Sequence, residues 1–338
     1  MTKRTRYFMA GSAAVLAAGL CTGLVAYYGG GFQPLSASTG PDELRYIPAD
    51  ATVVAYADIR TIMDSEFRTR LKAAMPMHEH GQQEFKRHTG IDIERDVDYI
   101  VAAMTGVPEA GRHPSGLVVV RGRFNDAELE TLAREHGGAE EKYRGKRLVS
   151  MMKGDGGGSV AFLETGLVAV GESAAIKKAI DAQMSATSIT ANTEMMDLVR
   201  DIGRTNNAWA VGRFDVLASH AKLPDQVARQ IPAVKWFAAA GHINGGIAGT
   251  VRAEARDDQA AENLRDVVRG LLALGRMQAQ ADPKAKSLVD TLQLTGTGKT
   301  VQLSFTVPAE VLELLPKPPA APAPMAPEAP EAPRPPQS

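Results

Sequence analysis

The chain has 338 residues, of which 44% are hydrophobic and 23% charged, a length that suits one large domain or two ordinary ones. Its 38 Lys and Arg residues against 39 Asp and Glu residues leave a formal net charge of -1, which excludes the basic surplus typical of nucleic-acid-binding proteins. The one cysteine, Cys21, excludes an intramolecular disulfide framework and every multi-cysteine metal site.

The N-terminal segment predicts a membrane anchor. Basic residues at positions 3, 4 and 6 precede an uncharged stretch whose apolar part begins at Phe8 and ends at Tyr28. At about 1.5 Å of rise per helical residue, residues 8–28 span roughly 30 Å, the thickness of the hydrocarbon core of a bilayer. The positive flank favours a cytoplasmic N-terminus, so we expect a single-pass protein of the bacterial inner membrane with a periplasmic body.

Two other fates of this segment stay open. A cleaved secretory signal would need small residues directly after the apolar run, and residues 24–26 (Leu-Val-Ala) fit that pattern poorly. A lipoprotein would need a small residue before the lipidated cysteine, whereas Leu20 precedes Cys21. An uncleaved anchor, comprising residues 1–28, is the favoured interpretation.

The composition at both ends of the remaining chain predicts segments without a core. Residues 29–41 are rich in Gly and Ser, which is typical of a flexible linker. Residues 316–338 are rich in Pro and Ala, which predicts a disordered, extended tail. The folded body is therefore expected within residues 42–315.

Alternating strand and helix patterns fill this body. In the first half we expect a helix that opens near Asp58 or Asp64, and a second helix with Asn125 as its N-cap and Glu128 three residues later. The strands expected in this half are residues 53–57, 97–104, 116–124 and 146–152, followed by a hairpin of 159–164 and 167–171 and a helix over 172–184.

The second half repeats this order. We expect a helical stretch up to about residue 230, a tight turn at Asn244-Gly245-Gly246, and a helix with Leu264, Val267, Val268, Leu271 and Leu272 on one face. The strands expected here are residues 208–214, 234–243, 246–255, 292–295 and 300–307, before a short helix over 309–315.

The repeated order predicts an α+β protein with an internal duplication. Each half reads as β-α-β-β-α-β, the order of ferredoxin-like (split β-α-β) folds with antiparallel sheets. The predicted halves are residues 42–187 and 188–315.

The start of the body carries a short resemblance. Tyr46-Ile47-Pro48-Ala49-Asp50 stands before a Val-Val-Ala-Tyr strand. This opening resembles that of uncharacterised bacterial membrane-anchored envelope proteins with an Ile-Pro-Ala-Asp start. The resemblance implies an envelope location and no particular activity.

Two candidate motifs, one for phosphate binding and one for calcium binding, are incomplete. Residues 296–300 (Gly-Thr-Gly-Lys-Thr) resemble the end of a phosphate-binding loop, but position 293 is Gln293 and a strand follows in place of a helix. The acidic run of Asp92, Glu94, Asp96 and Asp98 lacks the glycine and glutamate of a calcium loop.

One cluster has the chemistry of metal ligands. Met75, Met77, His78 and His80 lie within six positions, with His88 further on, and thioethers with imidazoles suit soft copper(I). Pro76 predicts a loop, where exposed histidines are common, so the cluster is a weak metal candidate. No nucleophile motif is present, and the chain is not expected to be an enzyme or to hold a cofactor.

The strand faces predict a polar docking surface. Val118, Val120 and Phe124 alternate with Val119, Arg121 and Arg123, and Arg252, Glu254 and Arg256 alternate with apolar residues in the second half. An ordinary solvated face with cross-strand ion pairs is the alternative interpretation.

The sequence therefore predicts an envelope interaction or scaffold module, anchored in the lipid bilayer through residues 8–28, with an envelope protein as partner and no nucleic acid. A Met/His metal-binding protein, or an enzyme without a recognisable motif, is the alternative.

Overall fold

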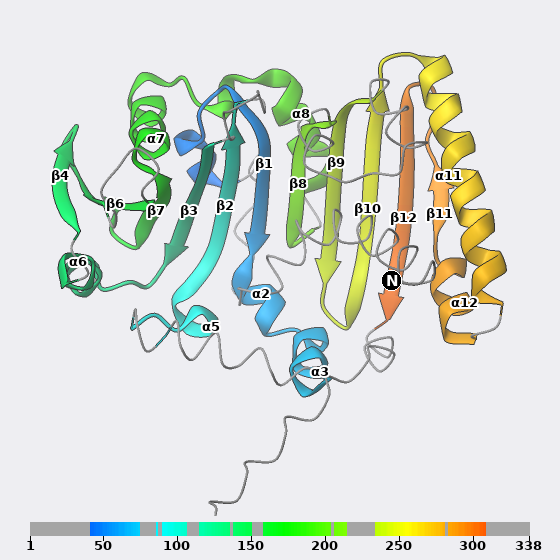
Figure 1. Ribbon diagram of the computed structural model, residues 1–338, viewed down its shortest axis with the longest axis horizontal. Helices are drawn as coiled ribbons and strands as arrows, with labels where there is room; N and C mark the ends of the chain where they lie inside the picture. The colour runs from blue at the N-terminus through cyan, green and yellow to red at the C-terminus, as the bar shows by residue number, and fades with distance from the viewer. Residues whose placement is uncertain are drawn as a thin grey trace, which may run out of the picture.

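The computed structural model describes residues 41–74, 86, 90–106, 115–135, 138–150, 158–203, 206–214, 234–280 and 283–308 (Figure 1). These residues form one twelve-stranded sheet in the order β11-β12-β10-β9-β8-β1-β2-β3-β7-β6-β5-β4. Every neighbouring pair is antiparallel. The expected α+β class with antiparallel strands is confirmed.

The described residues of the first half of the chain contribute seven strands. They are β1 (Ala51–Asp58), β2 (Val97–Thr105), β3 (Ser115–Gly122), β4 (Ala139–Tyr143), β5 (Lys146–Ser150), β6 (Gly158–Glu164) and β7 (Leu167–Glu172). Its helices are η1 (Asp42–Tyr46), α2 (Ile59–Met63), α3 (Glu66–Ala74), α5 (Ile93–Asp96), α6 (Asp126–Glu135) and α7 (Ser173–Ser185).

The second half contributes five strands among the described residues. They are β8 (Ala208–Arg213), β9 (Val234–Ile243), β10 (Gly246–Ala255), β11 (Gln293–Thr295) and β12 (Thr300–Pro308). Its helices are η3 (Ile189–Ala191), α8 (Thr193–Gly203), α11 (Asp258–Ala279) and α12 (Pro283–Asp290). The predicted turn at Asn244-Gly245 joins β9 to β10 as expected.

The two halves meet at the pairing of β1 with β8, in the middle of the sheet. Outward from this seam, the first half runs β1, β2, β3, β7, β6 and the second runs β8, β9, β10, β12, β11. In each half, three consecutive strands are followed by a helical excursion, and a later strand returns to pair with the third one. The halves thus share one topology, and the first adds the hairpin β4–β5.

This topology corrects the ferredoxin-like prediction. In a split β-α-β unit, the two strands joined by the first helix lie parallel with another strand between them. Here β1 and β2 are direct antiparallel neighbours, with Tyr56 opposite Val101. The local periodicity specified the strands, but pairing partners depend on contacts between distant segments, which periodicity does not report.

Helices cover both faces of the sheet. One face, the η1 face, packs against η1, α7, η3 and α8 around a core that includes Val54, Leu117, Ile176, Val199 and Trp209. The opposite face packs against α2 near β1 and β2, against α3 near β9 and β10, against α6 near β5 to β7, and against α11 near β10 and β12. Within the described residues, no helix has the length and apolar character needed to cross a membrane. The predicted span at residues 8–28 lies outside them.

The Ile-Pro-Ala-Asp opening has a structural role. Ile47 is fully buried and its carbonyl accepts a hydrogen bond from Ile189 N at 2.7 Å. Pro48 forms an isolated bridge with Ser188, and Asp50 pairs with Lys178 of α7. The opening therefore joins the start of the body to η3 and α7, far along the chain.

Candidate functional site

The predicted Met/His cluster lies outside the described residues. Met75, Met77, His78 and His80, together with His88, have no described position. In the part of the chain that the structure describes, no three His, Cys, Asp or Glu side chains come together as a metal site. Metal binding by this cluster stays a prediction.

The five residues predicted to form a docking surface occupy different environments. Arg121 of β3 pairs with Glu43, and Arg252 of β10 pairs with Asp201 and Glu254. Four strands separate β3 from β10, so at about 4.8 Å per strand the two arginines lie roughly 24 Å apart.

The other two arginines lie beyond the ends of their strands. Arg123 donates to the carbonyl of Arg95, and Arg256 lies 3.4 Å from Asp257 in the turn before α11. Arg121 and Arg252 share the η1 face, yet each is occupied by an ion pair. The five residues thus form no single contiguous patch, and a docking role for them stays a prediction.

A polar cluster on the η1 face was not predicted. Glu43 of η1 is 1% exposed, and its carboxylate accepts hydrogen bonds from Tyr99 Oη at 2.8 Å and from Arg121 Nη2 at 2.6 Å. Next to it, Glu164 accepts from Arg45 Nη2 at 2.6 Å and from Tyr46 Oη at 2.7 Å. A buried carboxylate is costly unless it is paired and hydrogen-bonded, so this cluster fixes η1 on the sheet.

The cluster shifts the titration of its members. Burial and the hydrogen bond to Glu164 raise the pKa of Tyr46 to about 12. Burial, with the nearby Glu43 carboxylate, raises the pKa of Tyr99 above its usual range. Burial tends to raise the pKa of the Glu164 carboxyl group. The hydrogen bond from Tyr46 and the charges of Arg45 and Arg121 outweigh this effect, so the pKa is lowered. The tyrosines thus stay protonated and the carboxylate stays ionised near neutral pH.

Aromatic rings extend this cluster to the central seam. Tyr56 of β1 stacks on Trp209 of β8, with ring centroids 5.6 Å apart, and its ring lies 5.8 Å from that of Tyr99. Burial raises the pKa of Tyr56 as well. Because these rings pack on one another, they act as a structural bridge between the halves.

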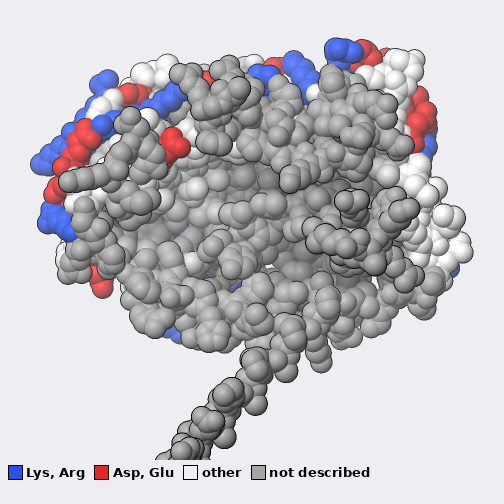
Figure 2. Space-filling view, in the orientation of Figure 1, with Lys and Arg blue, Asp and Glu red and all other residues white. Residues whose placement is uncertain are grey.

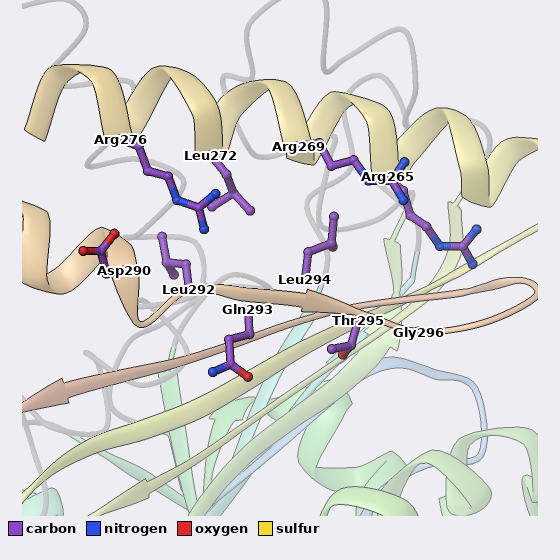
Figure 3. Close-up of a pocket in the computed structure, with 10 residues that line it drawn as sticks. All are labelled: Arg265, Arg269, Leu272, Arg276, Asp290, Leu292, Gln293, Leu294, Thr295 and Gly296. Carbon is purple, nitrogen blue, oxygen red and sulfur yellow. The ribbon is translucent and has the colours of Figure 1, made fainter.

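One cavity in the described structure lies at the edge of the sheet. It has a volume of about 550 Å³ and opens between α11, α12 and β11 (Figure 3). We call it the α11–β11 groove, and its lining residues are Arg265, Arg269, Leu272, Arg276, Asp290, Leu292, Gln293, Leu294, Thr295 and Gly296. Such a volume lies within the range of small-molecule sites.

The groove follows from the local sequence. Asp257 caps α11 by accepting a hydrogen bond from Ala260 N at 2.8 Å, and the helix then runs for 22 residues to Ala279. Positions 265, 269, 272 and 276 recur at helical spacing, so three arginines and one leucine face β11. Figure 3 shows Leu272 and Arg276 pointing from α11 toward the strand, and Leu292 and Leu294 pointing back.

The three arginines of the groove differ in their partners. Arg265 is buried and donates to the carbonyls of Gly298 at 2.5 Å and Thr300 at 3.1 Å. Arg269 lies 3.0 Å from Glu262 and 2.8 Å from Asp266. Arg276 is exposed and makes no ion pair or hydrogen bond with another described residue. The groove therefore combines an apolar floor with one available guanidinium.

The outer side of α11 is apolar and exposed. Leu271, Leu274 and Met277 are 54%, 50% and 61% exposed and lie on one side of the helix, away from the groove. At the right edge of Figure 2, the surface of the lower part of α11 is correspondingly uncharged, whereas Lys, Arg, Asp and Glu intermingle along the upper and left rims.

Comparisons with known proteins return only distant structural likeness. No family model matches the chain, and no curated protein matches it. Crystal form I of a protein named TP0453 gives a TM-score of 0.43 at 11% identity and covers 83% of this chain and 98% of its own. Crystal form III gives 0.46 at 10% identity, covering 82% and 98%. Values at this level give no basis for transferring a function.

Proposed function

We propose that the protein is a single-pass, membrane-anchored interaction module whose body lies outside the cytoplasm. The basic flank at positions 3–6 and the apolar residues 8–28 support the anchor. The resemblance of the Ile-Pro-Ala-Asp opening at residues 47–50 supports an envelope location. The proposed partner is an envelope protein, held by the body while residues 8–28 remain in the bilayer.

The observation that supports the interaction role most is the α11–β11 groove. It lies at the edge of the sheet and combines apolar side chains with a guanidinium that has no described partner. Arginine is enriched in protein interfaces, and the buried centre of an interface is more apolar than the rest of the surface. A broad sheet with a fixed edge groove is suited to presenting such a contact.

Two measurements test the anchor. A periplasm-dependent reporter fused after Leu315 is expected to be active, and the same reporter fused before Tyr7 is expected to be silent. The full-length protein is expected to stay in the membrane fraction after a carbonate wash. A soluble mature form that starts near Thr39 would instead identify residues 1–38 as a cleaved signal.

A third measurement tests the interaction role. The full-length protein, solubilised with its membrane and purified through an affinity tag, is expected to retain a defined envelope protein at a fixed ratio. The sequence-based alternative is metal binding by Met75, Met77, His78 and His80. That alternative predicts copper or zinc retained after purification and lost in a His78→Ala, His80→Ala double variant.

A further inference from the structure

We propose that the α11–β11 groove binds an extended peptide, which adds to β11 as a further strand and places a carboxylate on Arg276. This inference rests on the interaction role proposed above and names the chemistry of the partner. The ligand would be a segment with alternating apolar side chains and either an acidic residue or a free C-terminus.

The backbone of β11 provides the first part of the argument. Gln293, Leu294 and Thr295 pair with β12 on one side, and β11 is the last strand of the sheet on the other. Among the described residues, no backbone group on the outer side of β11 pairs with another strand. An open strand edge is the template that extended peptides use when they extend a sheet.

The floor of the groove provides the second part. Leu294 faces α11 beside its cross-strand partner Leu303, and Leu272 and Leu292 lie along the same cleft. In an added strand, every second side chain would point to this floor, because successive side chains alternate between faces. Apolar residues at alternate positions would therefore be selected.

The length of the groove sets the length of the ligand. Arg265 and Arg276 mark the extent of its α11 wall, and eleven helical steps of about 1.5 Å give roughly 16 Å. An extended chain covers that distance in about five residues at ~3.3 Å each. A peptide of five to seven residues would thus fill the groove.

Charge provides the last part. Arg265 and Arg269 are occupied by backbone carbonyls or carboxylates of α11, so they need no ligand. Arg276 lines the same wall without a described partner, and Asp290 across the groove is not within ion-pair distance of it. A ligand carboxylate would form a charge-assisted, bidentate pair with this guanidinium.

The test uses the full-length protein in detergent micelles and a fluorescein-labelled heptapeptide of alternating valine and serine with a free C-terminus. Fluorescence anisotropy measures its binding. Two comparison peptides carry either a C-terminal amide or N-methyl groups on alternate amides, which removes the carboxylate or the strand hydrogen bonds. The protein variants are Arg276→Gln and, as a matched control on the other face of the sheet, Arg200→Gln, which removes an exposed partner of Asp197.

The heptapeptide is expected to bind saturably. We expect Arg276→Gln and the C-terminal amide each to weaken binding about fivefold, close to 1 kcal/mol, and not to weaken it further when combined. N-methylation is expected to weaken binding at least as much, and Arg200→Gln to leave it unchanged.

Other results would overturn the inference. They are absence of saturable binding by the heptapeptide, equal affinity in Arg276→Gln, and full affinity of the N-methylated peptide. Binding of decanoate at this site without binding of the peptide would assign the groove to fatty carboxylates. A protein that retains an envelope partner but not the peptide would keep the proposed interaction role and lose only this site.

Discussion

Glu43 and Arg121 are separated by 78 positions in sequence and form an ion pair in which Arg121 Nη2 lies 2.6 Å from Glu43 Oε1. The Glu43 side chain is 2% exposed and that of Arg121 is 25% exposed. This pair connects the first helical turn of the body to the middle of the first half-sheet. It thereby fixes the point at which the N-terminal segment enters the fold.

Replacing Glu43 by Gln is expected to destabilise the body by about 2–3 kcal/mol, because it removes the buried carboxylate that pairs with Arg121 and leaves that guanidinium only the more distant Glu164 carboxylate, 3.6 Å away. Glu194→Gln is the control, since Glu194 and Lys235 form a pair that is 58% and 59% exposed. That change should cost less than ~0.5 kcal/mol. Urea unfolding monitored by circular dichroism measures both, and equal effects would contradict a special role for the buried pair.

Stability is expected to fall as the pH rises from about 10 to about 12. The folded protein holds the proton of Tyr46 up to a pKa of about 12, whereas an unfolded tyrosine releases it near 10. The unfolded chain thus binds fewer protons in this window, and stability decreases with pH.

Tyr46→Phe is expected to make this loss shallower, because the variant has no phenol to titrate at that position. Tyr56 and Tyr99, whose pKa values burial also raises, would maintain the remaining slope. Urea midpoints at pH 9, 10 and 11 measure the slope. Parallel curves for the two proteins would show that Tyr46 does not contribute.

The seam between the halves is expected to tolerate no added methyl group at Gly212. A Cβ atom at this position would lie 2.7 Å from the Thr52 carbonyl oxygen and 2.9 Å from Val53 Cα on the neighbouring strand. Gly212→Ala should therefore cost about 1–3 kcal/mol through backbone displacement at the β1–β8 pairing.

Gly270→Ala is the matched control for the seam variant. A Cβ at Gly270 of α11 would meet no atom within 4 Å, so the change should stabilise the helix by ~0.5–1 kcal/mol. Thermal unfolding of both variants gives the comparison. We expect Gly212→Ala to lower the unfolding temperature and Gly270→Ala to raise it. Changes in the same direction would contradict the close contact at the seam.

The wall of the α11–β11 groove depends on the cap of α11. Asp257→Ala removes the side-chain acceptor of Ala260 N and is expected to cost about 1 kcal/mol. Asp258→Ala, one position later, should cost only a few tenths of a kcal/mol, because it removes only a favourable charge near the helix N-terminus. Denaturant titration measures the free energy of unfolding of both variants. An equal loss in both would indicate that the charge near the helix N-terminus, and not the capping hydrogen bond, stabilises α11.

Most strands of this fold could be predicted from local sequence, because apolar residues alternate in them and turn residues bound them. The β9–β10 hairpin is the clearest example, with Asn244-Gly245 between two apolar strands. The strand β4 escaped prediction since four of its five residues, 139–142, are exposed and carry no apolar alternation.

The helix α8 was also missed, although it had a usable signal. Asn192 accepts a hydrogen bond from Met195 N at 3.1 Å, as an N-cap does, and Met195, Leu198 and Val199 follow at helical spacing. The strand order and the groove could not be predicted from local sequence, because both depend on contacts between distant segments. Tertiary packing of α11 places Arg276 beside Leu292 and Leu294, and no motif at those positions predicts this arrangement.

The central place of β1 has a consequence for how the chain is made. Residues 51–58 are among the first of the body to be synthesised, yet their partner β8 comes only at residues 208–213. Until then β1 presents an unpaired edge with Val53 and Val54, and an open edge invites pairing with other chains. A chain that stops before residue 208 is therefore expected to pair with copies of itself or to aggregate. In a chain that stops after Pro308, both edges of every central strand have a partner strand.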